Sequence, residues 1–241
     1  MLDWLRRDPR EVPHVAVGER LLPLDLRRRA QATRLTMRLA PDGSAVVVTM
    51  PRWGRTAEAL AFARSRADWL ARQLDAIPVA VPPADGTVLR YRGAELVLRH
   101  DPAARRRVEL NDGELRIGGP AASLPARLRR WLKDQATELF TEELAHYCAL
   151  AGKVPPGLAL SGALRRWGSC SAKGAIRINW RLIMAPDHVR RSVLAHEVAH
   201  LIHFNHSPQF HALVDQLFEG DLPDADRWLK REGRSLYIPF G

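Results

Sequence analysis

The residues with the clearest chemical potential are the run His196-Glu197-Val198-Ala199-His200 and, six positions later, His206. In an α-helix, residues four positions apart lie on one face, so His196 and His200 can bind a single metal ion from adjacent turns. Glu197 lies about 100° around the helix from His196, which places its carboxylate beside the metal, within reach of a metal-bound water. The run therefore predicts a metal site with two histidine ligands and a glutamate general base.

A third ligand must come from just beyond this helix, because catalytic zinc sites generally have three protein ligands and leave a fourth position for water. His206 is the nearest donor if the helix ends soon after His200 and the chain folds back. We expect that turn at Asn205, in a left-handed conformation. Ser207 is then expected to cap a new helix with Pro208 in its first turn. The predicted zinc ligands are therefore the three histidines.

Two other classes of zinc site are compatible with the same helical motif. Metzincins have glycine three residues after the second histidine and a later methionine turn, but this sequence has His203 there and no methionine after Met184, which excludes that class. In the gluzincin class an acidic residue of a later helix is the third ligand, a role open to Glu219 or Asp221. His206 is favoured because it needs no long return of the chain. The other nearby histidines are expected outside the ligand set: His203 and His211.

An ordinary buried helix with structural histidines is the competing interpretation of this stretch. The helix does have apolar neighbours on several sides, as a buried helix would: Val193, Leu194, Val198, Leu201 and Ile202. A third histidine at a useful distance and a predicted strand upstream nevertheless favour a metal site.

The composition indicates a folded protein without a membrane segment. Of the 241 residues 46% are apolar, which is ample for a packed core in one large or two smaller domains. Residues 1–8 lack an apolar run of signal-peptide length, and no uncharged apolar stretch of about 18 residues occurs. We therefore expect a cytoplasmic protein with no membrane partner. Cys148 and Cys170 are expected to remain reduced.

The net charge of +10 raises the question of nucleic-acid binding. The charge is spread along the chain, because residues 1–120 contain 21 basic and 15 acidic side chains and residues 121–241 contain 16 and 12. Most of the basic residues are arginines in an alanine-rich sequence, a pattern typical of codon bias. Nucleic acid is therefore the less favoured partner, and the sequence does not indicate an oligomeric state.

Residues 1–120 are predicted to form a β-rich domain with one helix. Alternating apolar and polar residues and intervening turns predict seven strands, at residues 14–17, 34–39, 44–50, 87–91, 94–99, 107–110 and 114–117. A helix is expected from an N-cap at Thr56 to about Ala76. The segment Gly118-Gly119-Pro120 ends the last strand, and we place the domain boundary there.

Residues 121–241 are predicted to form the domain that carries the histidines. We expect a helix over 124–150, strands over 158–161 and 175–182, a metal helix capped by Asp187, and helices over 208–218 and 224–232. In the second strand, Arg177 and Asn179 share one face, so we predict that they contact a substrate bound in extended form by strand addition. For Arg177, exposure to solvent without a binding role is the alternative.

Four segments together resemble the YgjP-like metallopeptidase family, which is related to the SprT-like and WLM zincins. They are Arg166-Trp167-Gly168-Ser169-Cys170-Ser171, Ile178-Asn179-Trp180-Arg181-Leu182, the histidine run itself and Asn205-His206-Ser207. The resemblance covers most of the chain. It implies an α+β fold with a small zincin-like catalytic domain, a Zn²⁺ ion bound by the three histidines, and Glu197 as the catalytic residue, but it implies no particular substrate.

The function expected from these residues is zinc-dependent hydrolysis of peptide bonds in a peptide or protein substrate. Zinc lowers the pKa of its water towards about 7 and polarises a carbonyl, and Glu197 takes up the proton of the water. The alternatives are a nucleic-acid-associated protease or binding module of the SprT-like kind and a metal-dependent hydrolase of nucleotides or phosphoanhydrides. Tyr237 and Arg166 could act as electrophiles, although packing and surface roles are the favoured interpretation for these two.

Overall fold

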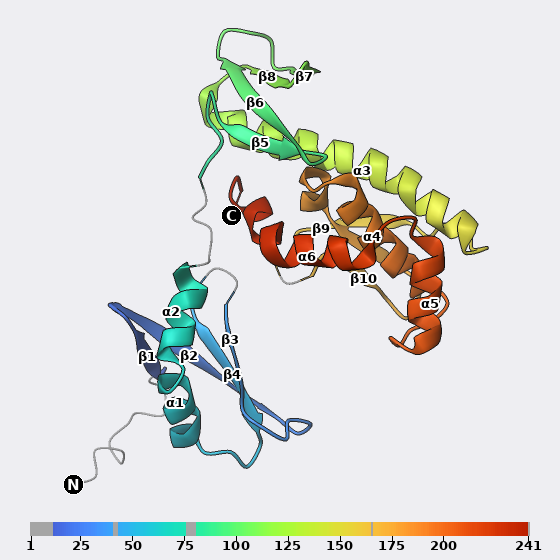
Figure 1. Cartoon of the computed structure of the whole chain (residues 1–241). Helices are drawn as coiled ribbons and strands as arrows, with labels where there is room; N and C mark the ends of the chain where they lie inside the picture. The colour runs from blue at the N-terminus through green and yellow to red at the C-terminus, as the bar shows by residue number, and fades with distance from the viewer. Residues whose placement is uncertain (1–11, 41–42, 76–80, 165, 241) are drawn as a thin grey trace. The chain divides into compact units, whose positions relative to one another are not determined.

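The computed structural model describes residues 12–40, 43–75, 81–164 and 166–240. The chain forms two compact units, residues 1–78 and 79–241 (Figure 1). Among the described residues, the first contains one β-sheet and two helices, and the second contains two small sheets and the remaining helices. This mixed architecture, with β-sheets towards the N-terminus and helices after them, confirms the predicted α+β class.

The first unit is a four-stranded sheet with strand order β1-β2-β4-β3. Its strands are β1 (His14–Val17), β2 (Arg20–Arg29), β3 (Thr36–Leu39) and β4 (Val46–Pro51). The predicted hairpin of the last two is confirmed, since β3 and β4 pair antiparallel. The ten-residue strand β2, which the sequence analysis did not identify, lies between β1 and β4 and pairs parallel with β4.

The helical segment of this unit is broken in two, where one continuous helix was expected. α1 (Thr56–Arg64) and α2 (Ala67–Asp75) are separated at Ser65, whose hydroxyl donates to the carbonyl of Phe62 at 2.9 Å. Thr56 is the first helical residue and Arg55 is the N-cap, while the expected end at Ala76 lies outside the described residues. The buried residues of both helices share a core with the sheet, because each helix has one apolar face.

The second unit begins with a sheet whose four strands were all predicted. They are β5 (Val88–Tyr91), β6 (Ala94–Asp101), β7 (Val108–Asn111) and β8 (Glu114–Gly118), in the order β5-β6-β8-β7. Asp112 and Gly113, with φ of +36° and +82°, make the tight turn between β7 and β8, as glycine and aspartate commonly do in short hairpins.

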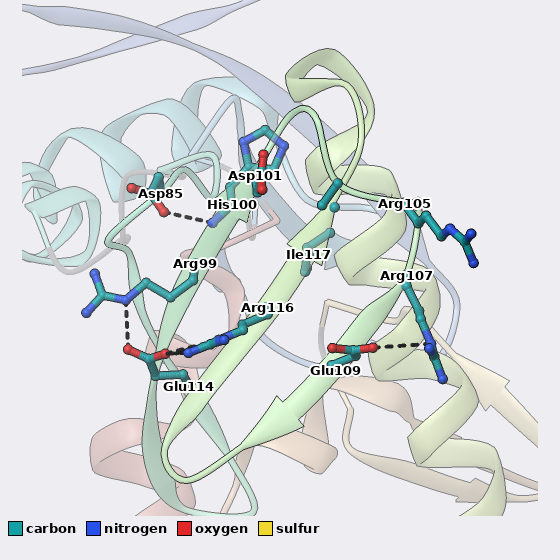
Figure 2. A pocket seen from close by; sticks show the side chains of 12 residues that line it. Asp85, Arg99, His100, Asp101, Arg105, Arg107, Glu109, Glu114, Arg116 and Ile117 are labelled. Atoms are coloured by element: carbon teal, nitrogen blue, oxygen red, sulfur yellow. Dashed lines mark hydrogen bonds and ion pairs between the residues drawn. The ribbon is translucent and has the colours of Figure 1, made fainter.

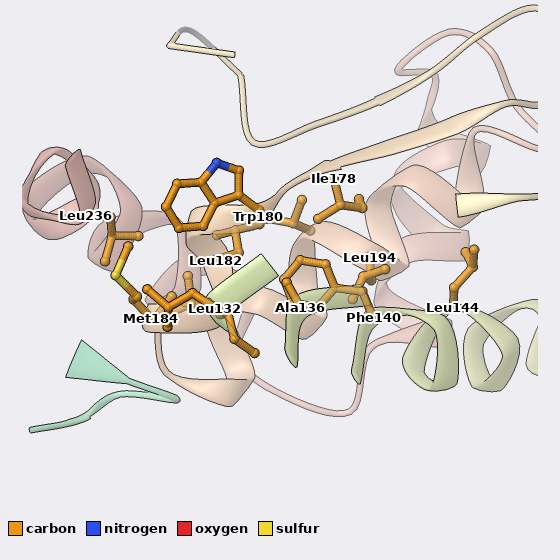
Figure 3. Close-up of a cluster of buried hydrophobic side chains, with 14 of the residues drawn as sticks. Leu132, Ala136, Phe140, Leu144, Ile178, Trp180, Leu182, Met184, Leu194 and Leu236 are labelled. Atoms are coloured by element: carbon orange, nitrogen blue, oxygen red, sulfur yellow. The ribbon is translucent and has the colours of Figure 1, made fainter. Parts of the chain in front are cut away.

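Helix α3 (Leu124–Leu150) has the predicted bounds and connects the parts of the second unit. It passes both the β5–β8 sheet and the helix that carries the histidines (Figure 1). Figure 3 shows its buried face, with Leu132, Ala136, Phe140 and Leu144, packed among side chains from the later part of the chain. Buried side chains of the β5–β8 sheet belong to the same core. The units therefore divide at 78/79 and not near residue 120, where the sequence analysis placed a boundary.

A three-stranded sheet and three helices complete the second unit. The strands are β9 (Leu158–Ser161), β10 (Gly168–Cys170) and β11 (Ile176–Asn179), in the order β10-β11-β9. The predicted strand 175–182 is shorter than expected, because residues from Trp180 form the 3₁₀ helix η3 (Trp180–Met184), with Asn179 as its N-cap. The helices are α4 (Asp187–Ala199), α5 (Pro208–Leu217) and α6 (Leu222–Glu232), and the 3₁₀ helix η4 (Gly233–Tyr237) follows.

A buried ion-pair network fixes the start of α4. Arg190 has no exposed surface; it donates to both carboxylate oxygens of Glu143 on α3, at 2.8 and 2.6 Å, and to Asp187 at 2.8 Å. Arg92, between β5 and β6, also binds Asp187. Burial raises the pKa of Asp187, but the hydrogen bonds and charges of the two arginines outweigh this effect and lower it to about 2. Asp187 therefore pairs with arginines and does not cap the helix, whose N-cap is Pro186.

None of the helices in the described ranges has the length and apolar character needed to span a membrane.

Candidate metal centre

The structure brings the three predicted histidines together. His196 lies in the last turn of α4, His200 is the C-cap of that helix, and His206 lies in the loop before α5. One ring nitrogen from each lies within 4.8 Å of the others, and the Nε2 atoms of His196 and His206 are 3.3 Å apart. Three imidazole nitrogens converging in this way form a donor set suited to a divalent metal such as zinc.

The loop between α4 and α5 returns the chain by a route different from the expected one. After His200, the amides of Leu201 and Ile202 bond to the carbonyls of Val198 and Ala199, so the helix ends in tight 3₁₀-type turns. Asn205 is not left-handed, because Arg92 and Asp112 are the only non-glycine residues with positive φ in the described part of the chain.

The start of α5 was predicted correctly. Ser207 is its N-cap, and the side chain accepts a hydrogen bond from the amide of Phe210 at 3.3 Å. Pro208 is the first helical residue, a position where the missing N–H costs nothing. The loop residue His206 is therefore held directly against a well-defined helix start.

A main-chain contact orients the ring of His200. Its Nδ1 lies 3.0 Å from the carbonyl oxygen of His203. Since a carbonyl can only accept, Nδ1 must carry the proton, and Nε2 of the neutral ring is left as the acceptor that a metal requires. His203 thus contributes through its backbone, in agreement with its predicted place outside the ligand set.

Phe210 forms an apolar floor beneath the histidines. This fully buried ring has its centroid 4.9, 4.5 and 4.8 Å from those of His196, His200 and His206. Burial, followed by the neighbouring histidines, lowers the pKa of His196 to about 4. The imidazole therefore stays neutral at physiological pH, which is the form that binds metal.

Glu197 is a buried carboxyl group, only 5% exposed. Burial raises its pKa to about 7, against the opposing effects of a hydrogen bond from the backbone amide of Cys170 and the charge of Arg166. The Oε2 atom is buried with no hydrogen-bond partner among the described residues. A buried polar atom without a partner is uncommon and calls for an explanation, and a reacting water or substrate would supply one.

Gly168 on β10 allows the close approach of Glu197. A Cβ atom at this position would lie 2.4 Å from Oε1 and 2.7 Å from Cδ of Glu197, which is too close for any side chain. The sequence analysis quoted Gly168 only as part of a family motif. A glycine at the start of a short strand gave no local sign that a carboxyl group from α4 occupies the missing space.

The two acidic residues considered as alternative ligands have other partners. Glu219 accepts a hydrogen bond from Tyr147 at 2.9 Å and forms an ion pair with Arg191 at 2.7 Å. Asp221 is the N-cap of α6 and accepts from the amide of Asp224. Neither belongs to the histidine cluster.

The two residues predicted to bind substrate occupy different environments. Asn179 is fully buried: its Nδ2 donates to the carbonyl of Ala163 at 2.8 Å and contacts the hydroxyl of Tyr237, while its Oδ1 accepts from the amide of Arg181. It organises the surrounding loop and does not face a substrate, contrary to the prediction. Arg177 is exposed on β11, in the strand at the centre of its sheet.

The two residues considered as electrophiles also differ. The hydroxyl of Tyr237 donates to the carbonyl of Ala163 at 3.0 Å, and its ring packs against Trp167 and Arg181. These contacts agree with the packing role that was favoured for it. Arg166 is exposed, and its charge acts on Glu197.

Two cavities of similar size lie in this unit. One, of about 550 Å³, is lined partly by His196 and Glu197. The other, of about 630 Å³, lies on the β5–β8 sheet and shares no lining residue with the first. Figure 2 shows that charged side chains surround the larger cavity and pair with one another: Arg99 and Arg116 with Glu114, and Arg107 with Glu109.

Comparison with protein families identifies the chain. A family model described as YgjP-like, metallopeptidase domain, matches residues 33–232, a range that includes the three histidines and Glu197. No curated protein and no solved structure matches the chain. The match extends over more than half of the sequence and confirms the resemblance drawn from the motifs, so the chain belongs to the YgjP-like metallopeptidase family.

Proposed function

We propose that the protein is a zinc-dependent metallopeptidase that hydrolyses peptide bonds with Glu197 as the general base. The observation that carries this proposal is the position of a buried carboxylate with one unpaired oxygen next to three converging imidazoles. The family supports the broader assignment to metallopeptidases.

The three histidines are the proposed ligands: His196, His200 and His206. When bound, zinc supplies Lewis acidity, which acidifies a water molecule and polarises the carbonyl to be cleaved. The low pKa of His196 favours its neutral, metal-binding form, and the hydrogen bond from Nδ1 of His200 leaves the Nε2 atom of that ring for the metal. His206 completes the set from the end of the α4–α5 loop, directly before the N-cap of α5.

Glu197 takes the proton from the attacking water and passes it to the departing amine. A pKa of about 7 suits this role, because a base is most effective when its pKa lies near the working pH. The amide of Cys170 holds the carboxylate from the β10 side, and Oε2 has no partner among the described residues. The free oxygen is the atom that we assign to proton transfer.

Strand β10 is the proposed binding edge for an extended substrate. The strand predicted for this role, β11, pairs with β10 on one side and β9 on the other, so neither of its edges is free. β10 is the outer strand of the sheet. The bonds that link Trp167 with Asn179 and Ser171 with Ala175 set an alternation in which the main-chain groups of Gly168 and Cys170 face the outer edge. The amide of Cys170 is engaged by Glu197 there, so the groups left for a peptide are those of Gly168 and the carbonyl of Cys170. A peptide strand could pair there, next to Glu197.

The test is the variant Glu197→Gln, assayed on a peptide library beside the wild type. Loss of the general base should reduce hydrolysis by about 10²- to 10⁴-fold, while zinc per protein stays unchanged because Glu197 is not a ligand. His203→Ala is the matched control, since only its backbone contacts the site. Hydrolysis at the wild-type rate by a zinc-loaded Gln variant would refute the assignment.

Nucleotides and nucleic acids, screened in parallel with and without chelator, test the alternative substrate classes.

A further inference from the structure

The cavity beside Glu197 has mainly apolar walls, contributed by four separate elements. Trp167 comes from the residue before β10, Val193 from α4, Val214 from α5 and Leu229 from α6. His196 and Glu197 line the same cavity, so a group bound in it lies next to the proposed reaction centre. Its volume of about 550 Å³ is within the range of about 300–1,000 Å³ typical of ligand pockets.

The wall formed by Trp167 is fixed in place from behind. A Cβ atom on Gly233, directly after α6, would lie 2.8 Å from Cζ2 of Trp167, so the indole occupies the space that a side chain would need. The ring of Tyr237 packs on the indole with centroids 5.7 Å apart. The indole is therefore held in position before any substrate arrives, and a rigid wall of this kind reduces the cost of ordering on binding.

The polar residues of the cavity, other than the catalytic glutamate and the histidines, are already engaged. Asp226 forms an ion pair with Lys230 at 2.5 Å, and both side chains are largely exposed. The hydroxyl of Ser192 donates to the carbonyl of Val189 in its own helix. The cavity thus offers mainly apolar surface. Among its described lining residues, Glu197 is the only carboxylate without an ion-pair partner. These walls favour binding of an apolar side chain of a ligand over a basic one.

We propose that this cavity is the specificity pocket of the enzyme and binds a large apolar side chain, such as leucine or phenylalanine, of the substrate residue next to the cleaved bond. The inference rests on the proposed peptidase function. An extended peptide on β10 alternates its side chains between two faces, so one side chain beside the reacting carbonyl can enter the cavity while the main chain stays paired with the strand.

The experiment measures kcat/KM on peptides that differ only at the residues on either side of the cleaved bond. For wild-type protein, kcat/KM should be higher for peptides with leucine or phenylalanine at the preferred position than for the peptide with alanine. The expected ratio is at least about 10-fold, because even a single methylene in an apolar pocket discriminates by about 10- to 200-fold. Aspartate and lysine should be poorer still. Equal cleavage of all these peptides would overturn the pocket while leaving the peptidase function intact. Cleavage of no peptide by the zinc-loaded protein would overturn both.

Two variants of Leu229 and one control variant test whether the preference for large apolar substrate residues arises in the cavity. Leu229→Trp fills the space and should remove the advantage of large apolar residues. Leu229→Ala enlarges it and should shift the preference towards the larger phenylalanine. Arg231→Trp, on the same helix but outside the cavity lining, should change neither. Zinc content and thermal unfolding are measured for each variant, so the Ala variant keeps the test decisive if the Trp variant does not fold. An unchanged preference in a folded Leu229→Ala variant would contradict the inference.

Discussion

The two cavities of the second unit are of similar size but differ in how their polar groups are satisfied. Around the larger one, on the β5–β8 sheet, Glu114 accepts from two arginines, at 2.9 and 3.1 Å. Beside the smaller one, Oε2 of Glu197 is buried without a hydrogen-bond partner among the described residues, and one ring nitrogen from each of three histidines lies within 4.8 Å of the others.

This difference indicates that the unpartnered oxygen of Glu197 is a better guide to the proposed chemistry than cavity volume is. Folding normally pairs buried polar atoms, and the ion pairs of the larger cavity need nothing further. The oxygen of Glu197 that has no partner among the described residues lies instead beside the histidines proposed to bind zinc. Burial also lowers the pKa of His196 to about 4 and raises that of Glu197 to about 7, as expected of groups at a functional site.

The largest expected effect is that of removing a ligand. In His206→Ala only the two helical imidazoles remain, so zinc retained after dialysis should fall far more than in Glu219→Ala, whose side chain is paired with Tyr147 and Arg191. Changes outside the ligand set typically cost about 10–100-fold in affinity. Zinc is measured per protein in both variants and in His203→Ala. Full occupancy in His206→Ala together with loss in Glu219→Ala would place the third ligand on the acidic residue.

An intermediate effect is expected from Gly168→Ala. The added Cβ would lie 2.4 Å from Oε1 of Glu197, so the carboxylate must move. A displacement of about 1 Å in a catalytic group can cost about 100-fold, and we expect a loss of that order in kcat with zinc retained. Ser169→Ala on the same strand is the control. A wild-type kcat in Gly168→Ala would show that the position of the Glu197 carboxylate is not critical for hydrolysis.

The smallest effect is predicted for the larger cavity. Arg116→Ala removes one of the two arginines of Glu114, and the arginine side chain is 63% exposed. Exposed ion pairs contribute little to stability because water and salt screen them, so peptide hydrolysis should change less than two-fold and thermal unfolding only slightly. Kinetics on the same peptides provide the measurement. A loss of activity comparable with that of Gly168→Ala would reverse the comparison and assign a function to the charged cavity.

The sequence predicted the parts of this protein that depend on local patterns. Pro125 near the start, Gly152 after the end and regularly spaced leucines determine α3, and its bounds agree with the prediction. The four-residue spacing of His196 and His200 and the cap at Ser207 depend on neighbouring residues only. For this reason the convergence of the three histidines could be anticipated.

The errors concern features that depend on distant partners. The edge position of β10 and the central position of β11 follow from the pairing of β11 with β9, which no short pattern reveals. Asn179 was assigned to an exposed face by alternation, but Ala163 and Tyr237 surround it. β2 was missed because Pro23 and the terminal arginines obscure the alternation of an otherwise apolar strand.

The misplaced domain boundary has a similar cause. The glycines near residue 118 do mark the end of a strand, since Gly118 is the last residue of β8 and Gly119 has a φ of +93°. Whether such a strand end separates two cores depends on where the preceding sheet packs. Here the β5–β8 sheet packs with α3, so the strand end lies inside a unit.

The ion pairs of Arg190 hold the helix that carries the histidines through groups other than the histidines themselves. They join the first turn of α4 to α3 and to the β5–β6 turn, at the end of the helix opposite to His196 and His200. Phe210 and the apolar core hold the other end from below. The axis and rotation of the helix are thus set by protein contacts alone, unlike in small zinc-dependent domains that unfold without metal. We therefore expect the chain to stay folded when the proposed zinc is removed, so that a chelator should abolish hydrolysis without unfolding the protein.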